Sequence, residues 1–241
     1  LLGDEAHHYN ANTQSQTQLF QSWEKLIEDI HQADLNNILL EFTATLDYEK
    51  PDIVKKYEDK VLFKYDLKQF RLDKFSKEIN LIRSNYDEKE RVIQAIILNQ
   101  YRQELATKQN INLKPVILFK AKQTIKESEQ NKQNFHRLIE SLDENSINSI
   151  RETSTVTIVQ KAFSFFDSIH LSSNELAKRL KSNFRPENCL SANDDKEAEA
   201  NKIKLNTLED ANNPIRAIFA VQKLNEGWDV LNLFDIVRLY E

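Results

Sequence analysis

Two acidic residues follow the short apolar run at the start of the chain, where they could bind a metal ion and activate water. The run Leu1-Leu2-Gly3 leads directly into Asp4-Glu5-Ala6-His7. Open α/β sheets bind ligands outside the carboxyl ends of their strands. Phosphoryl transfer uses such a pair, with one carboxylate on the magnesium shell and the next orienting the attacking water. The spacing therefore indicates a phosphoryl-transfer site, and the alternative is a solvated acidic strand end.

Two later strings also carry candidate site residues. Thr43 and Thr45 end the next apolar run, and their small hydroxyls can hydrogen-bond to the acidic pair without filling a cleft. Gly227 is one of only two glycines and stands beside Trp228 and Asp229, which indicates a backbone with positive φ or close approach to a ligand. The alternatives are the β-propensity of threonine and a plain turn with Trp228 in the core.

Two lysines and a histidine complete the candidates. Lys120 and Lys122 lie at and just beyond the end of an apolar run and could contact DNA phosphates, while a solvated face is an equal alternative. The pair His7-His8 has no third or fourth ligand at usable spacing, so a histidine metal site is excluded. We therefore group His7 with the acidic pair.

Strands and helices must alternate to position these residues. In the first 66 residues the apolar spacing predicts strands at the start of the chain, over 38–46 and over 61–65, with helices over 19–30 and 51–60. A second alternation predicts strands over 114–120, 189–192, 215–221 and 234–240, with helices over 125–142, 174–183 and 196–210. Strand, helix, strand is typical of a parallel sheet.

The stretch between the two alternations is charged and helical. Ile93, Ile97, Tyr101 and Leu105 mark one face of a long helix, so we interpret 67–112 as a helical connector. We interpret a further helical pattern near 143–173 as a helical insertion in the second domain. The predicted fold class is α/β, with two parallel-sheet domains over 1–66 (partial) and 113–241.

Composition narrows the functional classes. A chain of 241 residues with 40% apolar and 29% charged residues is that of a folded protein, and only 2 glycines and 4 prolines argue against an all-β fold. One cysteine excludes a disulfide framework and a cysteine zinc site, and favours a reducing, cytoplasmic setting. No run approaches the roughly 20 apolar residues of a membrane span. A net charge of −5 argues against a protein whose whole surface binds nucleic acid, although a local basic groove for nucleic acid remains possible.

Taken in order, the strings resemble the motifs of superfamily-two helicases of the DEAD/DEAH type. The string at Asp4 resembles motif II, Thr43-Ala44-Thr45 motif III, the strand ending at Lys120 motif IV, and Gly227 with Asp229 motif V. More narrowly, the strings 113–120 and 224–230 resemble the Res (restriction) subunit of type III restriction-modification enzymes.

The resemblance implies two RecA-like motor domains, with ATP and Mg²⁺ in a cleft and double-stranded DNA bound across the top. It also implies a separate nuclease domain and a modification (methyltransferase) subunit as partner. By this resemblance Asp4 holds Mg²⁺ and Glu5 polarises the attacking water. His7 belongs to the same motif, and Lys120 and Lys122 lie toward DNA.

The remaining roles and departures also follow from the resemblance. Thr43 and Thr45, with the motif II histidine, would link the ATP state to the DNA face, and Gly227 and Asp229 would meet the nucleotide from the second domain.

The 241 residues contain neither a Gly-rich phosphate loop nor an arginine-finger motif VI, so we expect no ATP turnover by this chain alone. Glu226 stands where many relatives carry Arg. The alternatives are a superfamily-two DNA or RNA motor without a nuclease, and a non-catalytic DNA-binding scaffold.

Overall fold

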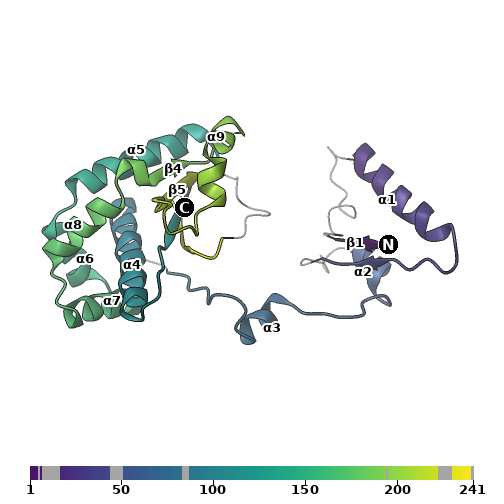
Figure 1. The fold of residues 1–241 in the computed structure, drawn as a ribbon, viewed down its shortest axis with the longest axis horizontal. Coiled ribbons are helices and arrows are strands. Elements are labelled where there is room, and N and C mark those ends of the chain that lie inside the picture. Colours follow the sequence, from purple (N-terminus) through teal and green to yellow (C-terminus); the bar gives the residue numbers. More distant parts are fainter. Residues whose placement is uncertain are drawn as a thin grey trace. The chain divides into compact units, whose positions relative to one another are not determined.

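The protein divides into two compact units, residues 1–80 and 81–241. The computed structural model describes residues 1–4, 6, 17–43, 51–82, 87–193, 195–221 and 230–239 (Figure 1). Each unit contains its own parallel sheet, and among the described residues no sheet runs through both Thr43 and Val116. The predicted α/β class with two separate parallel sheets is confirmed.

The first unit is built on a two-stranded parallel sheet. Strand β1 pairs with β2 so that Leu2 lies opposite Leu40 and Gly3 opposite Glu41. The elements of this unit are β1 (Leu2–Gly3), α1 (Thr17–Gln32), β2 (Leu40–Glu41), α2 (Pro51–Tyr57) and α3 (Leu67–Leu72). The predicted strand, helix, strand order is therefore present, with shorter strands than the apolar runs indicated.

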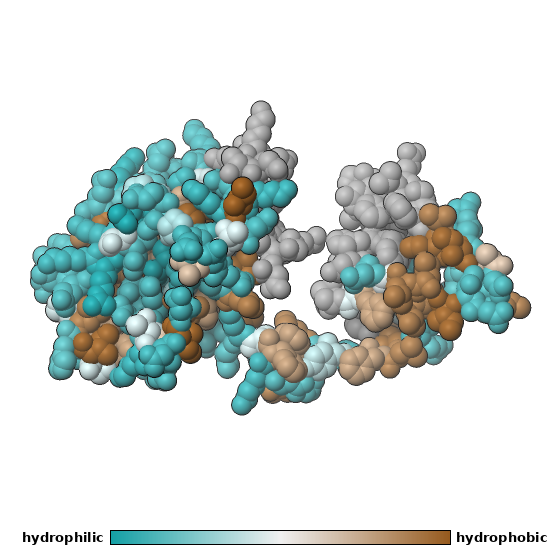
Figure 2. Space-filling model, viewed as in Figure 1, coloured by the Kyte–Doolittle hydropathy of each residue, from teal (hydrophilic) through white to brown (hydrophobic). Residues whose placement is uncertain are grey.

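The strand predicted over 61–65 is wrong. This segment has no regular secondary structure and pairs with no strand among the described residues, and Leu62 and Phe63 are 87% and 80% exposed. Strand formation requires a neighbouring backbone to pair with, which local apolar character does not supply. Figure 2 shows apolar side chains gathered at the surface of the first unit. Leu2, Ile38 and Phe42 are large apolar residues of this unit and are 73%, 68% and 55% exposed.

The second unit contains a four-stranded parallel sheet of order β4-β5-β3-β6. Its strands are β3 (Val116–Lys120), β4 (Cys189–Ser191), β5 (Ala217–Ala220) and β6 (Leu233–Arg238). Its helices are α4 (Glu88–Lys108), α5 (Ile125–Ser141), α6 (Glu144–Thr153), α7 (Thr157–Ser168), α8 (Ser173–Asn183) and α9 (Asp195–Asn206), with a 3₁₀ turn over Pro186–Asn188.

Alternation along β3 divides the core of the second unit between the two faces of the sheet. Ile117 and Phe119 belong to a large apolar cluster with buried residues of α4 to α8, whereas Val116 and Leu118 belong to a smaller cluster with Leu205 of α9. Successive side chains of a strand point to opposite faces, so one strand contributes to both clusters. The sheet is therefore covered on both faces, as parallel sheets usually are.

The long helix α4 is part of the core of the second unit. Ile96 and Ile97 are fully buried, and the helix packs against α6, α7, β3 and β6. A capping box begins it, in which Asp87 accepts from the Glu90 amide at 2.8 Å and Glu90 accepts from the Asp87 amide at 3.3 Å. The stretch 67–112 is thus shared, with α3 in the first unit and α4 in the second.

Helices α6 and α7 occupy the stretch in which an insertion was predicted. Ile147 and Ile150 of α6 and Phe166 of α7 are fully buried in the large cluster. Tyr101 of α4 contacts Phe165 of α7 edge to face, with ring centres 5.3 Å apart. These helices therefore enlarge the core around α4, on the same sheet face as α5.

Candidate functional site

The carboxyl ends of β1 and β2 bring two of the predicted motifs together. The Phe42 amide donates to the Gly3 carbonyl at 2.7 Å, and the Ala6 amide donates to the Phe42 carbonyl at 2.9 Å. Asp4 follows Gly3 and is exposed, and Thr43 follows Phe42 and is half-buried. Parallel pairing therefore places Asp4 and Thr43 at the same edge of the sheet.

Most of the other predicted motif residues lie outside the described residues, namely Glu5, His7, Thr45, Gly227 and Asp229. Within the described ranges, no three His, Cys, Asp or Glu side chains gather closely enough to hold a metal ion. Asp4 offers an exposed carboxylate, which is the ligand type that Mg²⁺ prefers. The chemistry of Asp4 therefore fits the predicted magnesium role.

The two lysines predicted to lie toward DNA are at the carboxyl edge of the second sheet. Lys120 is the last residue of β3 and lies opposite Ala220 of β5. Lys122 follows the strand and is exposed, whereas Lys120 is half-buried. Of the two, Lys122 has the more accessible ammonium group for a phosphate.

A polar cluster at the end of β4 was not predicted from the sequence. The Ser191 hydroxyl donates to Glu129 Oε1 at 2.6 Å, and the side-chain amide of Asn193 donates to the same oxygen at 2.8 Å. The Lys132 ammonium donates to the Ser191 hydroxyl at 2.9 Å. Ser191 and Glu129 are 62 positions apart in the sequence, so no local spacing connects them. The cluster joins α5 to the carboxyl end of β4 and holds the Lys132 ammonium there.

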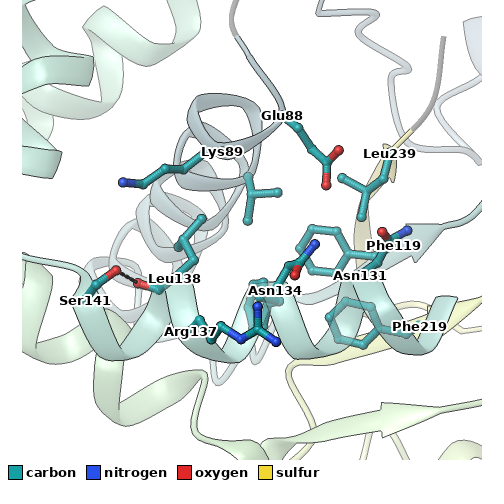
Figure 3. Close-up of a pocket in the computed structure, with 12 residues that line it drawn as sticks. Glu88, Lys89, Phe119, Asn131, Asn134, Arg137, Leu138, Ser141, Phe219 and Leu239 are labelled. Atoms are coloured by element: carbon teal, nitrogen blue, oxygen red, sulfur yellow. Dashed lines mark hydrogen bonds between the residues drawn. The ribbon is translucent and has the colours of Figure 1, made fainter. Parts of the chain in front are cut away.

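A cavity of about 420 Å³ lies between α4, α5 and the carboxyl half of the sheet (Figure 3). Phenylalanine and leucine side chains form most of its wall, and polar side chains of α4 and α5 line the remainder. Its size falls within the roughly 300 to 1,000 Å³ of small-molecule sites. The lining residues are Glu88, Lys89, Val92, Phe119, Asn131, Asn134, Phe135, Arg137, Leu138, Ser141, Phe219 and Leu239.

The amino edge of the second sheet holds a buried polar network. Arg216 is 3% exposed and donates to the Pro115 carbonyl at 3.0 Å, to Gln103 at 2.7 Å and to Asn99 at 2.7 Å. Burial lowers the pKa of Arg216 to about 10. Its hydrogen bonds join α4 to the starts of β3 and β5, so the network at this edge holds the helix and the two strands together.

Among the described helices, none is both long and apolar enough to cross a membrane. No protein-family model matches the chain, and no solved structure matches it either.

The chain is 38% identical, over 291 aligned residues, to a protein of Haemophilus influenzae described as a probable type III restriction-modification enzyme HindVIP Res subunit. The match takes in the whole chain and 55% of that protein, so the chain spans about half the length of this relative. The Res resemblance was drawn from the strings 113–120 and 224–230. That resemblance is confirmed: along its whole length, the chain is similar to a type III restriction-modification Res subunit.

Proposed function

We propose that the chain is part of an ATP-dependent DNA translocase or helicase motor of a type III-like restriction endonuclease. The observation that carries this proposal is the pairing of β1 with β2, which brings Asp4 and Thr43 to one sheet edge. A nucleotide-driven motor requires its magnesium ligand and its coupling residues at the carboxyl ends of neighbouring parallel strands. The whole-chain similarity to a Res subunit supports the same function.

In the proposed motor, Mg²⁺ bound with ATP would supply positive charge against the charge that develops on the phosphates. Asp4 would hold the ion, and Glu5 would accept a proton from the attacking water. Thr43 and Thr45, together with His7, would report the state of the nucleotide to the DNA-binding face.

The second unit would contribute to both ligands. Gly227 and Asp229 would meet the nucleotide, and Lys120 and Lys122 would contact phosphates of double-stranded DNA. The partner of such a motor is the modification (methyltransferase) subunit of the same system. We expect ATP turnover only in a polypeptide that also supplies a phosphate loop, because backbone amides and the loop lysine make most of the phosphate contacts.

The decisive experiment is Glu5→Gln in the longer polypeptide that contains this chain. Glutamine keeps the size of the side chain but cannot accept a proton from water, so ATP and DNA binding should persist. Hydrolysis should fall by about 10²- to 10⁴-fold, the usual cost of removing a general base. Asp4→Asn should instead weaken Mg²⁺-dependent nucleotide binding.

Glu28→Gln is the matched control, because Glu28 is an exposed carboxylate on α1 of the same unit. DNA-stimulated ATP hydrolysis by the control should equal that of the parent. If Glu5→Gln also stayed within about threefold of the parent, far less than general-base loss predicts, Glu5 would not activate the water and the proposed mechanism would be wrong.

A further inference from the structure

The wall of the cavity between α4 and α5 is aromatic. The Phe119 ring lies 5.0 Å from that of Phe219 and 5.1 Å from that of Phe135, and Phe135 and Phe219 are 5.4 Å apart. All three rings are at most 3% exposed, so their positions are set by core packing. The cavity is therefore preformed and apolar on this side.

The mouth of the cavity is polar and has hydrogen-bonding capacity to spare. Among the described residues, the side chains of Glu88, Asn131 and Arg137 make no hydrogen bond or ion pair, and the Asn134 carbonyl oxygen accepts from Gln130 at 2.9 Å. Figure 3 shows the Glu88 side chain reaching over the aromatic wall from α4, and Asn131, Asn134 and Arg137 projecting from α5. A carboxylate, two amides and a guanidinium thus surround one opening.

We propose that this cavity binds a purine base that carries an exocyclic amino group. Proteins recognise unstacked bases by apolar and aromatic contact on the ring and by hydrogen bonds at its edge. Asparagine suits the donor and acceptor pair of adenine, and a carboxylate accepts from an exocyclic amine. Arg137 at the rim can meet the phosphate attached to the sugar.

The apolar wall distinguishes a base from a bare phosphate. Lys89 and Arg137 line the cavity together with Glu88, so charge does not exclude an anion, but the aromatic wall gives a bare phosphate no partner. An aliphatic ligand would fill the cavity but would leave the Glu88 and Asn131 groups unpaired. An amino-substituted purine satisfies the wall and the mouth together.

The ligand can come from a free adenine nucleotide or from an unstacked base of a DNA strand, since both present the same ring. The first probe is adenosine, which has no phosphate and so does not depend on the magnesium site at Asp4. We expect saturation-transfer NMR and calorimetry on the 241-residue chain to detect adenosine binding without Mg²⁺. Inosine carries a carbonyl in place of the amine and should bind about tenfold more weakly, since one hydrogen bond of about 1.4 kcal/mol is lost.

Variants at the mouth test the position of the site. Asn131→Leu should weaken adenosine binding about tenfold, while Gln133→Leu, at an exposed position of the same helix, should leave it unchanged. Glu88→Gln should reverse the preference between adenosine and inosine, because the glutamine amide can donate to the inosine carbonyl. Unchanged protection of the buried Cys189 thiol from labelling would show that each variant is folded.

The source of the base is found by comparing ATP without Mg²⁺ with a short single strand containing dA. Tighter binding of the strand, sensitive to Asn131→Leu, identifies a DNA base, and tighter binding of ATP identifies a free nucleotide. No adenosine binding at millimolar concentration, equal binding of inosine, or indifference to Asn131→Leu would each overturn the proposal. Such a result would leave the proposed motor intact, because that function is tested by hydrolysis in Glu5→Gln.

Discussion

Replacing Arg216 tests whether the buried network at the amino edge of the second sheet stabilises that unit. In Arg216→Met the side chain keeps its apolar bulk but loses every donor. Three acceptors then lose their guanidinium donor: the Pro115 carbonyl, which lies 3.0 Å from it, and the side-chain oxygens of Gln103 and Asn99, which each lie 2.7 Å from it. The backbone carbonyl of Pro115 cannot turn away to find another partner.

The expected loss follows from these contacts. A buried group left without its hydrogen bond costs about 1 to 3 kcal/mol, and the two side-chain amides can partly reorient. Removing the guanidinium also removes its own desolvation cost, which offsets part of the loss. We therefore expect a net destabilisation of about 2 to 3 kcal/mol, below the roughly 3 to 5 kcal/mol of an unpaired buried charge, because the groups left behind are neutral.

Thiol labelling of Cys189 in urea measures this loss. Cys189 is the sole cysteine of the chain, lies in β4 and is 5% exposed. Burial raises the pKa of its thiol to about 12, so the folded state is inert to thiol reagents. Labelling therefore reports unfolding of the second unit alone. With a urea slope of about 1 to 3 kcal/mol per molar, a loss of about 2 to 3 kcal/mol should lower the midpoint by roughly 0.7 to 3 M.

Arg179→Met is the matched control. The Arg179 side chain is 48% exposed and pairs with Glu104 at 2.6 Å. Exposed ion pairs contribute about 0 to 1 kcal/mol, so the midpoint should move little. Equal shifts in Arg179→Met and Arg216→Met would refute the view that burial makes the Arg216 network stabilising.

Three further outcomes are expected. Thr124→Ala removes the capping box of α5, in which Thr124 accepts from the Glu127 amide at 3.1 Å, and should cost about 1 kcal/mol in the same urea assay, while Thr124→Ser should cost little. Burial raises the pKa of Asp235 above 3.8, so the contribution of this side chain to the free energy of unfolding falls as the pH rises from 3.8 through the folded-state pKa. The loss of unfolding free energy caused by Asp235→Asn, relative to the parent, should therefore be smaller at pH 7 than at pH 3.5. A larger loss at pH 7 would contradict this reasoning. Backbone amides of β1 and β2 should exchange faster in hydrogen-exchange mass spectrometry than those of β3 and β5, because a two-stranded sheet is marginally stable.

Local sequence determined the parts of this protein that depend on neighbouring residues. Apolar periodicity predicted α1, α4 and α5, because a helix face is built from residues three and four positions apart. The capping boxes at Asp87 and Thr124 begin α4 and α5 through bonds across three positions. The apolar runs before Asp4 and Thr43 likewise placed both residues at strand ends.

Tertiary structure alone decided the features that join distant residues. The strand order β4-β5-β3-β6 brings Ser191 to Glu129 and Arg216 to Asn99, pairs separated by 62 and 117 positions. The apolar run 61–65 has the composition of a strand yet lacks a pairing partner among the described residues. The composition of a segment gives it a propensity to form a strand, but a strand forms only where a neighbouring backbone is available to pair with it. For the same reason the aromatic cavity was not predicted, because its wall joins α4, α5, β3 and β5 only after the sheet has formed.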